Sequence, residues 1–336
     1  MTGRTTAAQQ STVSPSKVLD LIGSKLDLVE EELRRNFRSR IRTIDEVGTH
    51  ILDGGGKRIR PILLLLVSSM LDYEGTTDVV YAAVVEFIHT ATLVHDDIID
   101  EAEIRRGRSS INHRWGNHLT VLVGDYLYTH AMKMALREKS LEVVELLCDT
   151  TIQMTEGEIL GLENKGRVDL TSDEYFDVVG RKTAALFGAS CLVPSHLISS
   201  SQAEADRLYK YGYDLGICFQ LIDDLLDFTS STEVLGKPTV SDLKEGKMTL
   251  PVILALPMMD DAERSVVERI VSGRFDLTED PSTIVDIVQR YGGVERTRNI
   301  AREYADRALG HLEYFPPSAA REGLEYAVHF VLDRDR

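Results

Sequence analysis

The chain has 336 residues, of which 43% are hydrophobic, so there is ample material for a large folded core. Its 54 acidic and 38 basic residues leave a formal net charge of −16, and a chain this acidic is not expected to bind nucleic acid. Three cysteines lie far apart in apolar stretches, without zinc spacing or a disulfide framework, which favours free thiols in a reducing compartment: Cys148, Cys191 and Cys218.

Helical periodicity runs through most of the chain. From Leu19 to Leu33, apolar residues recur at spacings of three and four, which places them on one face of a helix. No alternating strand pattern or hairpin turn signal stands out. Comparable helical stretches follow at residues 61–72, 78–101, 119–138, 141–163, 173–199, 202–229, 249–257, 261–272, 281–291, 294–313 and 318–333.

The segments between these helices do not divide the chain. Residues 1–14 are polar and lack the apolar core of a signal peptide, so we expect a disordered leader. The longest apolar run, from Pro61 to Val67, is too short to span a bilayer, which predicts a soluble, cytoplasmic protein. Because no linker rich in glycine, proline or serine interrupts residues 15–336, we predict a single large all-α domain, a helical bundle.

A basic loop at residues 54–61 precedes one of the predicted helices. Its three glycines allow close backbone approach, and a helix N-terminus favours anions. Among its cations are Lys57 and Arg60. A solvated surface loop explains such a motif as well as an anion site does.

Two aspartate clusters of the pattern D-D-x-x-D occur at residues 96–100 and 223–227, each inside an apolar helical stretch. The outer aspartates of a cluster are four residues apart and share one helical face, where like charges repel. A solvated acidic face is the usual explanation, but the apolar flanks indicate a cleft. Mg²⁺ prefers one or two carboxylates together with phosphate oxygens. The clusters therefore predict a metal site formed by the outer aspartates, which are Asp96, Asp100, Asp223 and Asp227.

Further polar residues flank the first cluster. Arg105 and Arg106 follow it closely, and an arginine fork binds phosphate oxygens in a bidentate manner. The ordinary alternative for either arginine is a salt bridge to Glu101 or Glu103. His89 lies two helical turns before the cluster on nearly the same face, which favours contact with a substrate over a purely structural role.

Basic residues also occur near the second cluster. Lys182 and Thr183 interrupt an apolar helix, where a lysine is costly unless it faces water or a ligand. Lys237 and Lys247 lie in a glycine-containing segment after the cluster, which could close over a bound diphosphate. Each of these lysines is equally compatible with an ordinary surface position.

In chain order, these motifs resemble the trans-isoprenyl diphosphate synthases, the polyprenyl synthetase family, over about residues 15–336. The resemblance is closest to the bacterial long-chain polyprenyl diphosphate synthases. The matching runs are GGKRIRP, LVHDDIIDEAEIRRG, VLVGDYL, the Lys-Thr pair at 182–183, FQLIDDLLD, GKP followed by DLKEGKMTLP, and FPPS before the last helix.

The resemblance implies an isoprenoid synthase bundle with a central cavity, which condenses isopentenyl diphosphate with an allylic diphosphate using about three Mg²⁺ ions. The metal ligands would be the four outer aspartates. The allylic diphosphate would be bound by Arg105, Lys182 and Lys237, with Lys247 closing over it. Isopentenyl diphosphate would be bound by Lys57, Arg60, His89 and Arg106. The residues at the reacting centre would be Asp96, Asp100, Lys182, Thr183, Gln220 and Asp223.

Product length is predicted from the helix that precedes the first cluster. Ala91 and Thr92 lie about one turn before Asp96, where bulky aromatics stop chain growth early in the family. Because both are small, we expect the channel to continue past Ile88, with Met132 as a deeper stop. This predicts an all-trans product of about seven to ten isoprene units (C35–C50). Simple packing of Ala91 and Thr92 against a neighbouring helix is the alternative.

Three other functions remain compatible with parts of this pattern. A farnesyl or geranylgeranyl diphosphate synthase would make a shorter product. A terpene cyclase would not need the second basic site, and a non-catalytic partner subunit would be expected to have lost aspartates. We further expect a homodimer with helices near 78–138 at the interface, no nucleic acid partner, and membrane contact only for product release.

Overall fold

Helices dominate the computed structural model, which describes residues 15–229, 240–273 and 282–335, and the predicted all-α class is confirmed. The expected leader at 1–14 and Lys237 lie outside the described residues. The helices of the first half are α1 (Pro15–Phe37), α2 (Arg42–Asp53), α3 (Ile59–Met70), α4 (Thr77–Ile99), α5 (Ile111–Trp115), α6 (Asn117–Arg137) and α7 (Leu141–Glu163).

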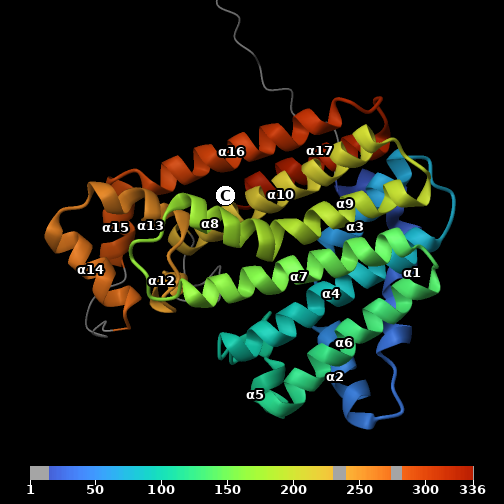
Figure 1. The fold of residues 1–336 in the computed structure, drawn as a ribbon, viewed down its shortest axis with the longest axis horizontal. Coiled ribbons are helices and arrows are strands. Elements are labelled where there is room, and N and C mark those ends of the chain that lie inside the picture. The colour runs from blue at the N-terminus through green and yellow to red at the C-terminus, as the bar shows by residue number, and fades with distance from the viewer. Residues whose placement is uncertain (1–14, 230–239, 274–281, 336) are drawn as a thin grey trace, which may run out of the picture.

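The second half begins with three consecutive helical segments, α8 (Ser172–Val179), the π-helix η1 (Gly180–Ala184) and α9 (Ala185–Leu197). The segments that follow are α10 (Gln202–Thr229), α12 (Ser241–Lys244), α13 (Leu250–Ala255), η2 (Leu256–Met258), α14 (Asp261–Val271), α15 (Ser282–Arg290), α16 (Gly293–Leu312), α17 (Ala319–Leu332) and η3 (Asp333–Asp335). Figure 1 shows α13, α14 and α15 together at one end of the bundle.

Helix α4 is a central helix of the bundle. It packs against α6, α3, α1 and α9, and side chains such as Tyr81, Val84 and Phe87 are fully buried. A helix that is apolar on all sides belongs in the interior. By length and composition α4 could also cross a membrane, but 67% of its most apolar window is buried inside the protein. Its hydrophobicity is therefore explained by core packing.

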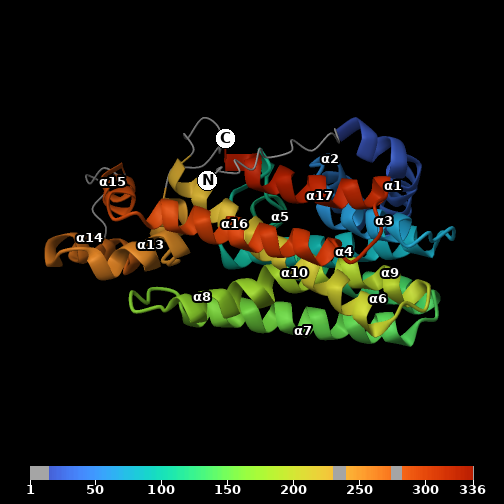
Figure 2. The ribbon, with the colours of Figure 1, turned by 90° about the horizontal axis from the view of Figure 1, so that it is seen from above.

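Helix α10 is the second central element. It packs against α16, α9 and η1, and Figure 2 shows α4 and α10 between α16 on one side and α7 on the other. Its first turns carry the buried core residues Leu208 and Tyr211, and its last turns carry the second aspartate cluster. The core therefore holds the two cluster-bearing helices in place.

Two local features differ from the sequence prediction. The stretch predicted as one helix at 173–199 contains a π-helical turn at Gly180–Ala184 between α8 and α9. A short hairpin also follows α4, with strands β1 (Ile104–Arg105) and β2 (Arg108–Ser109). Its turn residues Arg106 and Gly107 have φ values of 53° and 73°, as a primed hairpin turn requires. Strands of two residues are too short to show alternation, so the pattern gave no signal.

Candidate active site

The first aspartate cluster occupies the C-terminal end of α4. Asp100 is the C-cap residue, and Asp96 lies one turn earlier on the same face, as predicted. Burial raises the pKa of Asp96 to about 6, although Lys182 opposes the shift. Asp97 faces inward, and its Oδ1 accepts hydrogen bonds from Nε and Nη2 of Arg105, each at 2.6 Å. Arg105 therefore pairs with Asp97 rather than with Glu101 or Glu103.

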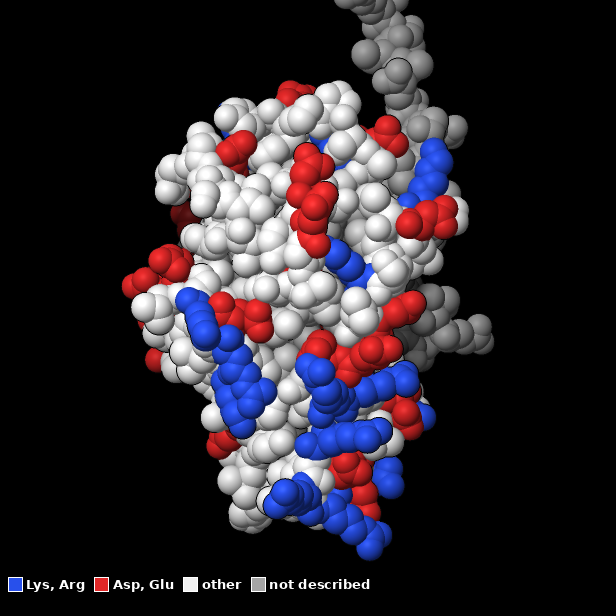
Figure 3. Space-filling view, turned by 90° about the vertical axis from the view of Figure 1, so that its right-hand side faces the viewer, with Lys and Arg blue, Asp and Glu red and all other residues white. Residues whose placement is uncertain are grey.

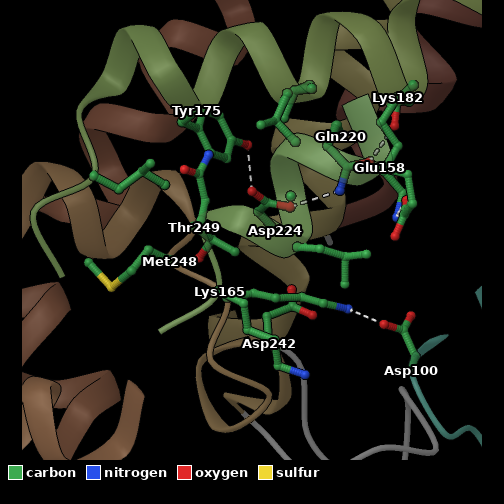
Figure 4. A pocket seen from close by; sticks show the side chains of 18 residues that line it. Asp100, Glu158, Lys165, Tyr175, Lys182, Gln220, Asp224, Asp242, Met248 and Thr249 are labelled. Atoms are coloured by element: carbon green, nitrogen blue, oxygen red, sulfur yellow. Dashed lines mark hydrogen bonds and ion pairs between the residues drawn. The ribbon is translucent and has the colours of Figure 1, made fainter. Parts of the chain in front are cut away.

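The three aspartates of the second cluster have different surroundings on α10. Asp223 is 43% exposed and lies 3.0 Å from Nη2 of Arg334. Asp224 is buried, and it accepts hydrogen bonds from the Tyr175 hydroxyl at 2.5 Å and from Gln220 Nε2 at 2.9 Å. Burial raises the pKa of Asp224 to about 8. Figure 4 shows Asp224 between these two partners.

Asp227 is buried and faces the N-terminus of α12. Its Oδ1 accepts from both the backbone N–H and the hydroxyl of Ser241 at 3.0 Å, and its Oδ2 accepts from the backbone N–H of Asp242 at 3.2 Å. In this structure, then, the Asp227 carboxylate anchors the segment after the second cluster. Its predicted role as a metal ligand stays a prediction.

The π-helix η1 presents Lys182 and Thr183 to the first cluster and to α10. Lys182 Nζ pairs with Glu158 of α7 and lies 3.8 Å from Asp96 Oδ2, while the Thr183 hydroxyl donates to Gln220 Oε1 at 3.0 Å. Helix α7 approaches closely at Gly157, where an added Cβ would lie 2.7 Å from the backbone nitrogen of Lys182. Such π-helical turns frequently occur at functional sites.

Lys247 joins the segment after α12 to the end of α4. Its Nζ donates to Asp100 Oδ1 at 2.8 Å and to Glu245 Oε2 at 2.9 Å. Burial opposes ionisation of Asp100, but the hydrogen bond and charge of Lys247 outweigh it and lower the pKa of that carboxyl. The pair keeps both groups charged at neutral pH.

The basic loop before α3 forms a second group of cations. Arg60 is buried with its guanidinium 4.4 Å from the Phe187 ring, and its Nε has no hydrogen-bond partner within the described residues. Burial and then the charge of Arg60 lower the pKa of His89 well below its usual value, so the imidazole is neutral. Arg106 hydrogen-bonds to the carbonyl of Gly55, whereas Lys57 is exposed near Asp223.

Arg58, which the sequence left without a role, is fixed in a partly buried ion-pair network. Its Nε lies 2.6 Å from Glu30, and its Nη1 lies 2.7 Å from the buried Glu86. Gly56 makes room for this arrangement, because an added Cβ would lie 2.9 Å from both Arg58 and Arg106. Arg58 thus stabilises the loop that carries the other cations.

Two neighbouring cavities bring these groups together. The first, of about 350 Å³, lies between α3, α4, α7, η1 and α10. The second, of about 220 Å³, lies between Asp100, Lys247 and Asp224, and Figure 4 shows its lining. Both are lined by Lys182, Thr183 and Gln220. The predicted residues that line the first cavity are Arg60, His89, Thr92, Asp96, Lys182, Thr183, Gln220 and Asp223.

The donor set suits Mg²⁺ bound together with a phosphate group. Asp96 and Asp223 come from different helices and line the same cavity, with Asp100 one turn from Asp96. Within the part of the chain that the structure describes, no group of three or more His, Cys, Asp or Glu side chains is clustered tightly enough to hold a metal alone. Mg²⁺ typically uses one or two carboxylates plus substrate phosphates, so these aspartates fit that mode.

Comparison with known proteins agrees with this geometry. The Polyprenyl synthetase family model matches residues 41–288. The chain belongs to the polyprenyl synthetase family. It is 38% identical to octaprenyl diphosphate synthase of Escherichia coli K12 over 324 residues, covering 95% of this chain and 99% of that protein. It is also 34% identical to heptaprenyl diphosphate synthase component 2 of Geobacillus stearothermophilus, covering 94% and 97%.

Solved structures extend the similarity to the whole fold. A decaprenyl diphosphate synthase from Rhodobacter capsulatus matches with a TM-score of 0.91 and 35% identity, over 96% of this chain and 99% of that one. A polyprenyl synthase from Caulobacter crescentus, in complex with calcium and isoprenyl diphosphate, matches with a TM-score of 0.92 and 32% identity over 98% and 100%. The expected isoprenoid synthase fold and the assignment as a prenyltransferase enzyme are confirmed.

The chain-length residues of this synthase lie in two environments. Thr92 lines the larger cavity, and its hydroxyl donates to the carbonyl of His89 at 2.8 Å. Ala91 and Ile88 are buried in the core, and Met132 lies between α6 and α7 with its sulfur 3.9 Å from that of Cys148. Of the four residues predicted to control product length, only Thr92 is among the described residues that line the two cavities.

Sequence reasoning missed three groups at the site, namely Glu158, Tyr175 and Arg334. Glu158 is visible in the sequence only as part of an acidic pair around Gly157. Tyr175 and Arg334 lie 49 and 111 residues from their aspartate partners, so no local pattern could connect them.

Proposed function

We propose that this enzyme condenses isopentenyl diphosphate with an allylic diphosphate in a Mg²⁺-dependent reaction, and makes a long-chain all-trans polyprenyl diphosphate of about seven to ten isoprene units. One observation carries the proposal. A single cavity is lined by an aspartate from each cluster, Asp96 and Asp223, and by the cations Arg60 and Lys182. This combination suits two diphosphate groups, of which one is held through metal.

The lysines of the site are paired with its aspartates, and a bound diphosphate with Mg²⁺ could replace the partner of each. Lys182 neighbours Asp96, and Lys247 is bonded to Asp100. A diphosphate that arrives with Mg²⁺ offers a cation to each carboxylate and oxygens to each lysine, so the pairs separate without leaving a buried charge unpaired. We propose that Arg105, whose Nε and Nη2 are held by Asp97, and Lys237, outside the described residues, complete the allylic diphosphate site.

The reaction then needs no nucleophile from the protein. The allylic C–O bond breaks and its electron pair leaves with the diphosphate, whose developing charge Lys182 and Lys247 stabilise. Bound Mg²⁺ would supply further charge stabilisation at the same oxygens. The alkene of isopentenyl diphosphate attacks the allylic cation to form the new C–C bond, and a proton is lost to the departing diphosphate. We propose that the oxygens of Thr183 and Gln220, which line the same cavity as Asp96, stabilise the cation.

Isopentenyl diphosphate is assigned to the basic group around α3. Arg60, whose buried Nε has no hydrogen-bond partner among the residues that the structure describes, and the neutral His89 both offer hydrogen-bond donors beside the larger cavity. We propose that Lys57 and Arg106, on the glycine-rich loop and the β1–β2 turn, bind the same diphosphate, although Arg106 lines an adjoining pocket with Arg105 and neither residue lines the larger cavity itself. The related polyprenyl synthase that was solved with calcium and isoprenyl diphosphate supports a diphosphate and a divalent cation in this fold.

Two alternatives to this proposal concern a second protein subunit and the length of the product. The match to heptaprenyl diphosphate synthase component 2 leaves room for a two-component enzyme, although this chain keeps all six cluster aspartates. A farnesyl or geranylgeranyl diphosphate synthase would use the same site with a shorter cavity. Thr92, a small residue directly on the cavity wall, favours the longer product.

We also propose a homodimer with α6 at its interface, in the cytoplasm. Val121 and Leu122 on α6 are 44% and 64% exposed, and Ile152 and Ile159 on the neighbouring α7 are 57% and 51% exposed. Exposed apolar patches of this kind mark protein interfaces. Sedimentation at micromolar concentration should show a dimer, and a monomer alone would contradict this assembly.

The function is tested by release of diphosphate from the purified protein supplied with isopentenyl diphosphate, farnesyl diphosphate and Mg²⁺. Wild type should release diphosphate only with metal present, and Asp96→Asn should lower the rate on the order of 100-fold. Asp306→Asn, at an exposed position on α16, is the matched control and should retain the wild-type rate. No turnover by wild type without a second protein would favour the partner-subunit alternative instead.

A further inference from the structure

An arginine-rich corner lies between α1 and α2, in a chain whose net charge is −16. Five arginines occur within residues 34–42, and all five are exposed. Arg35 pairs with Glu32 and Arg42 pairs with Glu46. Within the described residues, no ion pair joins the other three to a carboxylate; these are Arg34, Arg38 and Arg40. The corner is therefore a local excess of positive charge.

Further cations lie at the same end of the molecule, at the end of α6, the helix that we propose at the homodimer interface. Lys133, Arg137 and Lys139 are exposed there. His130 Nε2 lies 3.1 Å from Asn36 Oδ1, which joins α6 to the end of α1. Figure 3 shows this end, where basic side chains gather over its lower half. Because the proposed dimer would cover α6, we restrict the name basic end to residues 34–42.

Large aliphatic side chains project among these cations. Ile41 is 60% exposed and Leu28, which lies beside Arg34 and Arg35, is 42% exposed. The one aromatic residue in the arginine run, Phe37, is buried at 4% exposure. Sites for single-stranded nucleic acid combine cations with exposed aromatic rings, whereas membrane-surface segments combine cations with side chains that enter the acyl boundary. The exposed residues here match the membrane pattern.

A surface groove of about 530 Å³ crosses the basic end between α1 and the N-terminus of α4. Arg34, Arg35 and Arg38 form one wall, and Leu28, Val79 and Val80 give it an apolar surface. Two acidic residues, Glu31 and Glu32, also line it, and Glu32 is neutralised by Arg35. Apolar surface beside arginines suits a lipid chain with an anionic headgroup.

The basic end lies at the opposite end of α4 from the aspartates. The groove includes Thr76 and Val79, whereas Asp96 and Asp100 lie at the other end of this 23-residue helix. A helix of that length spans roughly 35 Å. A chain that grows along α4 away from the aspartates would therefore point toward the basic end.

We propose that the basic end docks on a membrane surface containing anionic phospholipid. Arginine side chains would contact headgroup phosphates, while Ile41 and Leu28 enter the headgroup–acyl boundary. This inference goes beyond the proposed reaction and does not depend on it, because docking can be measured without substrate.

The test is co-sedimentation of the full-length protein with vesicles at low ionic strength. Wild type should bind vesicles of phosphatidylcholine containing phosphatidylglycerol, and bind vesicles of phosphatidylcholine alone far less. The triple variant Arg34→Gln, Arg38→Gln, Arg40→Gln should lose binding on the order of 100-fold, since each cation near an anionic surface contributes about fivefold. Ile41→Ser should weaken binding to a smaller degree.

A matched control changes three exposed cations elsewhere, on α10, α15 and α16: Lys210→Gln, Arg290→Gln and Arg302→Gln. This control removes three positive charges, as the test variant does, and it should bind vesicles like the wild type. Thermal melts of both triple variants check that they are folded. Equal losses in the two triple variants would overturn the proposal, as would equal binding to both vesicle types. Binding of single-stranded RNA but not of vesicles would assign the basic end to nucleic acid and also overturn it.

Discussion

Lys247 Nζ lies 2.8 Å from Asp100 Oδ1, although 147 residues separate the two in the chain. The contact fastens the segment after α12 onto the C-terminal end of α4, beside the smaller cavity. Without metal or substrate, the lysine supplies the charge that Asp100 needs. We therefore propose that the lysine competes with Mg²⁺ for the carboxylate and binds the diphosphate once metal has replaced it.

Replacement of this lysine should separate the two roles. In Lys247→Gln we expect Mg²⁺ to bind the substrate-free enzyme several-fold more tightly, because its competitor is gone. We expect kcat to fall on the order of 100-fold, because a cation that stabilises the leaving group is lost. Calorimetric titration with Mg²⁺ and steady-state kinetics measure the two effects, with Lys244→Gln, at the one exposed position of α12, as the control. Unchanged kcat would remove Lys247 from the site.

The two diphosphate sites should respond differently to mutation. Arg60→Ala should raise the KM for isopentenyl diphosphate more than that for the allylic primer, because Arg60 faces the larger cavity from α3. Lys182→Ala, beside Asp96, should instead raise the KM for the primer or lower kcat. Initial rates with each substrate varied in turn make the comparison. Equal changes for both substrates would show that the assignment of cations to the two sites is wrong.

Much of this arrangement could be predicted from local sequence. The predicted helices at 141–163 and 202–229 match α7 and α10, because their apolar patterns are long and uninterrupted. The aspartate pairs required only helical periodicity to be placed on one face. The π-helical turn at Gly180–Ala184 could not be predicted in this way, since nothing in its own apolar pattern marks it and the close neighbour Gly157 belongs to another helix.

Long-range pairing accounts for the rest of what the sequence left open. Arg334 contacts Asp223 from the end of the chain, and its guanidinium lies 4.7 Å from the Phe219 ring. Asp227 looks identical to Asp223 in the D-D-x-x-D pattern, but the structure turns it toward the N-terminus of α12. Such differences depend on which segments pack together, which a motif does not encode.

Asp224 should make the free energy of unfolding depend on pH. Burial raises its pKa from 3.8 to about 8, so between these values the folded state holds a proton that the unfolded state has released. The resulting stabilisation is complete below pH 3.8 and is lost as the pH rises through 8. The contribution of this group should therefore fall by about 1 kcal/mol per pH unit between roughly pH 5 and pH 7.

Urea unfolding of wild type and Asp224→Asn across this range tests the effect. The variant should show a flatter pH dependence, whatever its stability at any one pH, because its amide does not titrate. Asp306→Asn, which changes an exposed carboxyl on α16, should keep the wild-type slope. A slope in Asp224→Asn equal to that of wild type would contradict the raised pKa.

Product length should respond to bulk along α4. Thr92→Phe places a ring directly in the larger cavity, so we expect products of about three or four isoprene units with the first condensations intact. Ala91→Phe should shorten the product similarly, at a stability cost of about 1–3 kcal/mol because Ala91 is buried. Chromatography of the dephosphorylated products, with melting temperatures recorded for both variants, measures this. Full-length product from Thr92→Phe would contradict the predicted path.

The most direct measurement is the product profile of the wild-type enzyme alone. Purified protein is incubated with Mg²⁺, labelled isopentenyl diphosphate and farnesyl diphosphate, and the products are dephosphorylated and separated by chain length. We predict a principal all-trans product between C35 and C50, formed only when metal is present. Arrest at farnesyl or geranylgeranyl diphosphate would contradict the long-chain assignment, and absence of any condensation by the purified protein would contradict the proposed catalytic site.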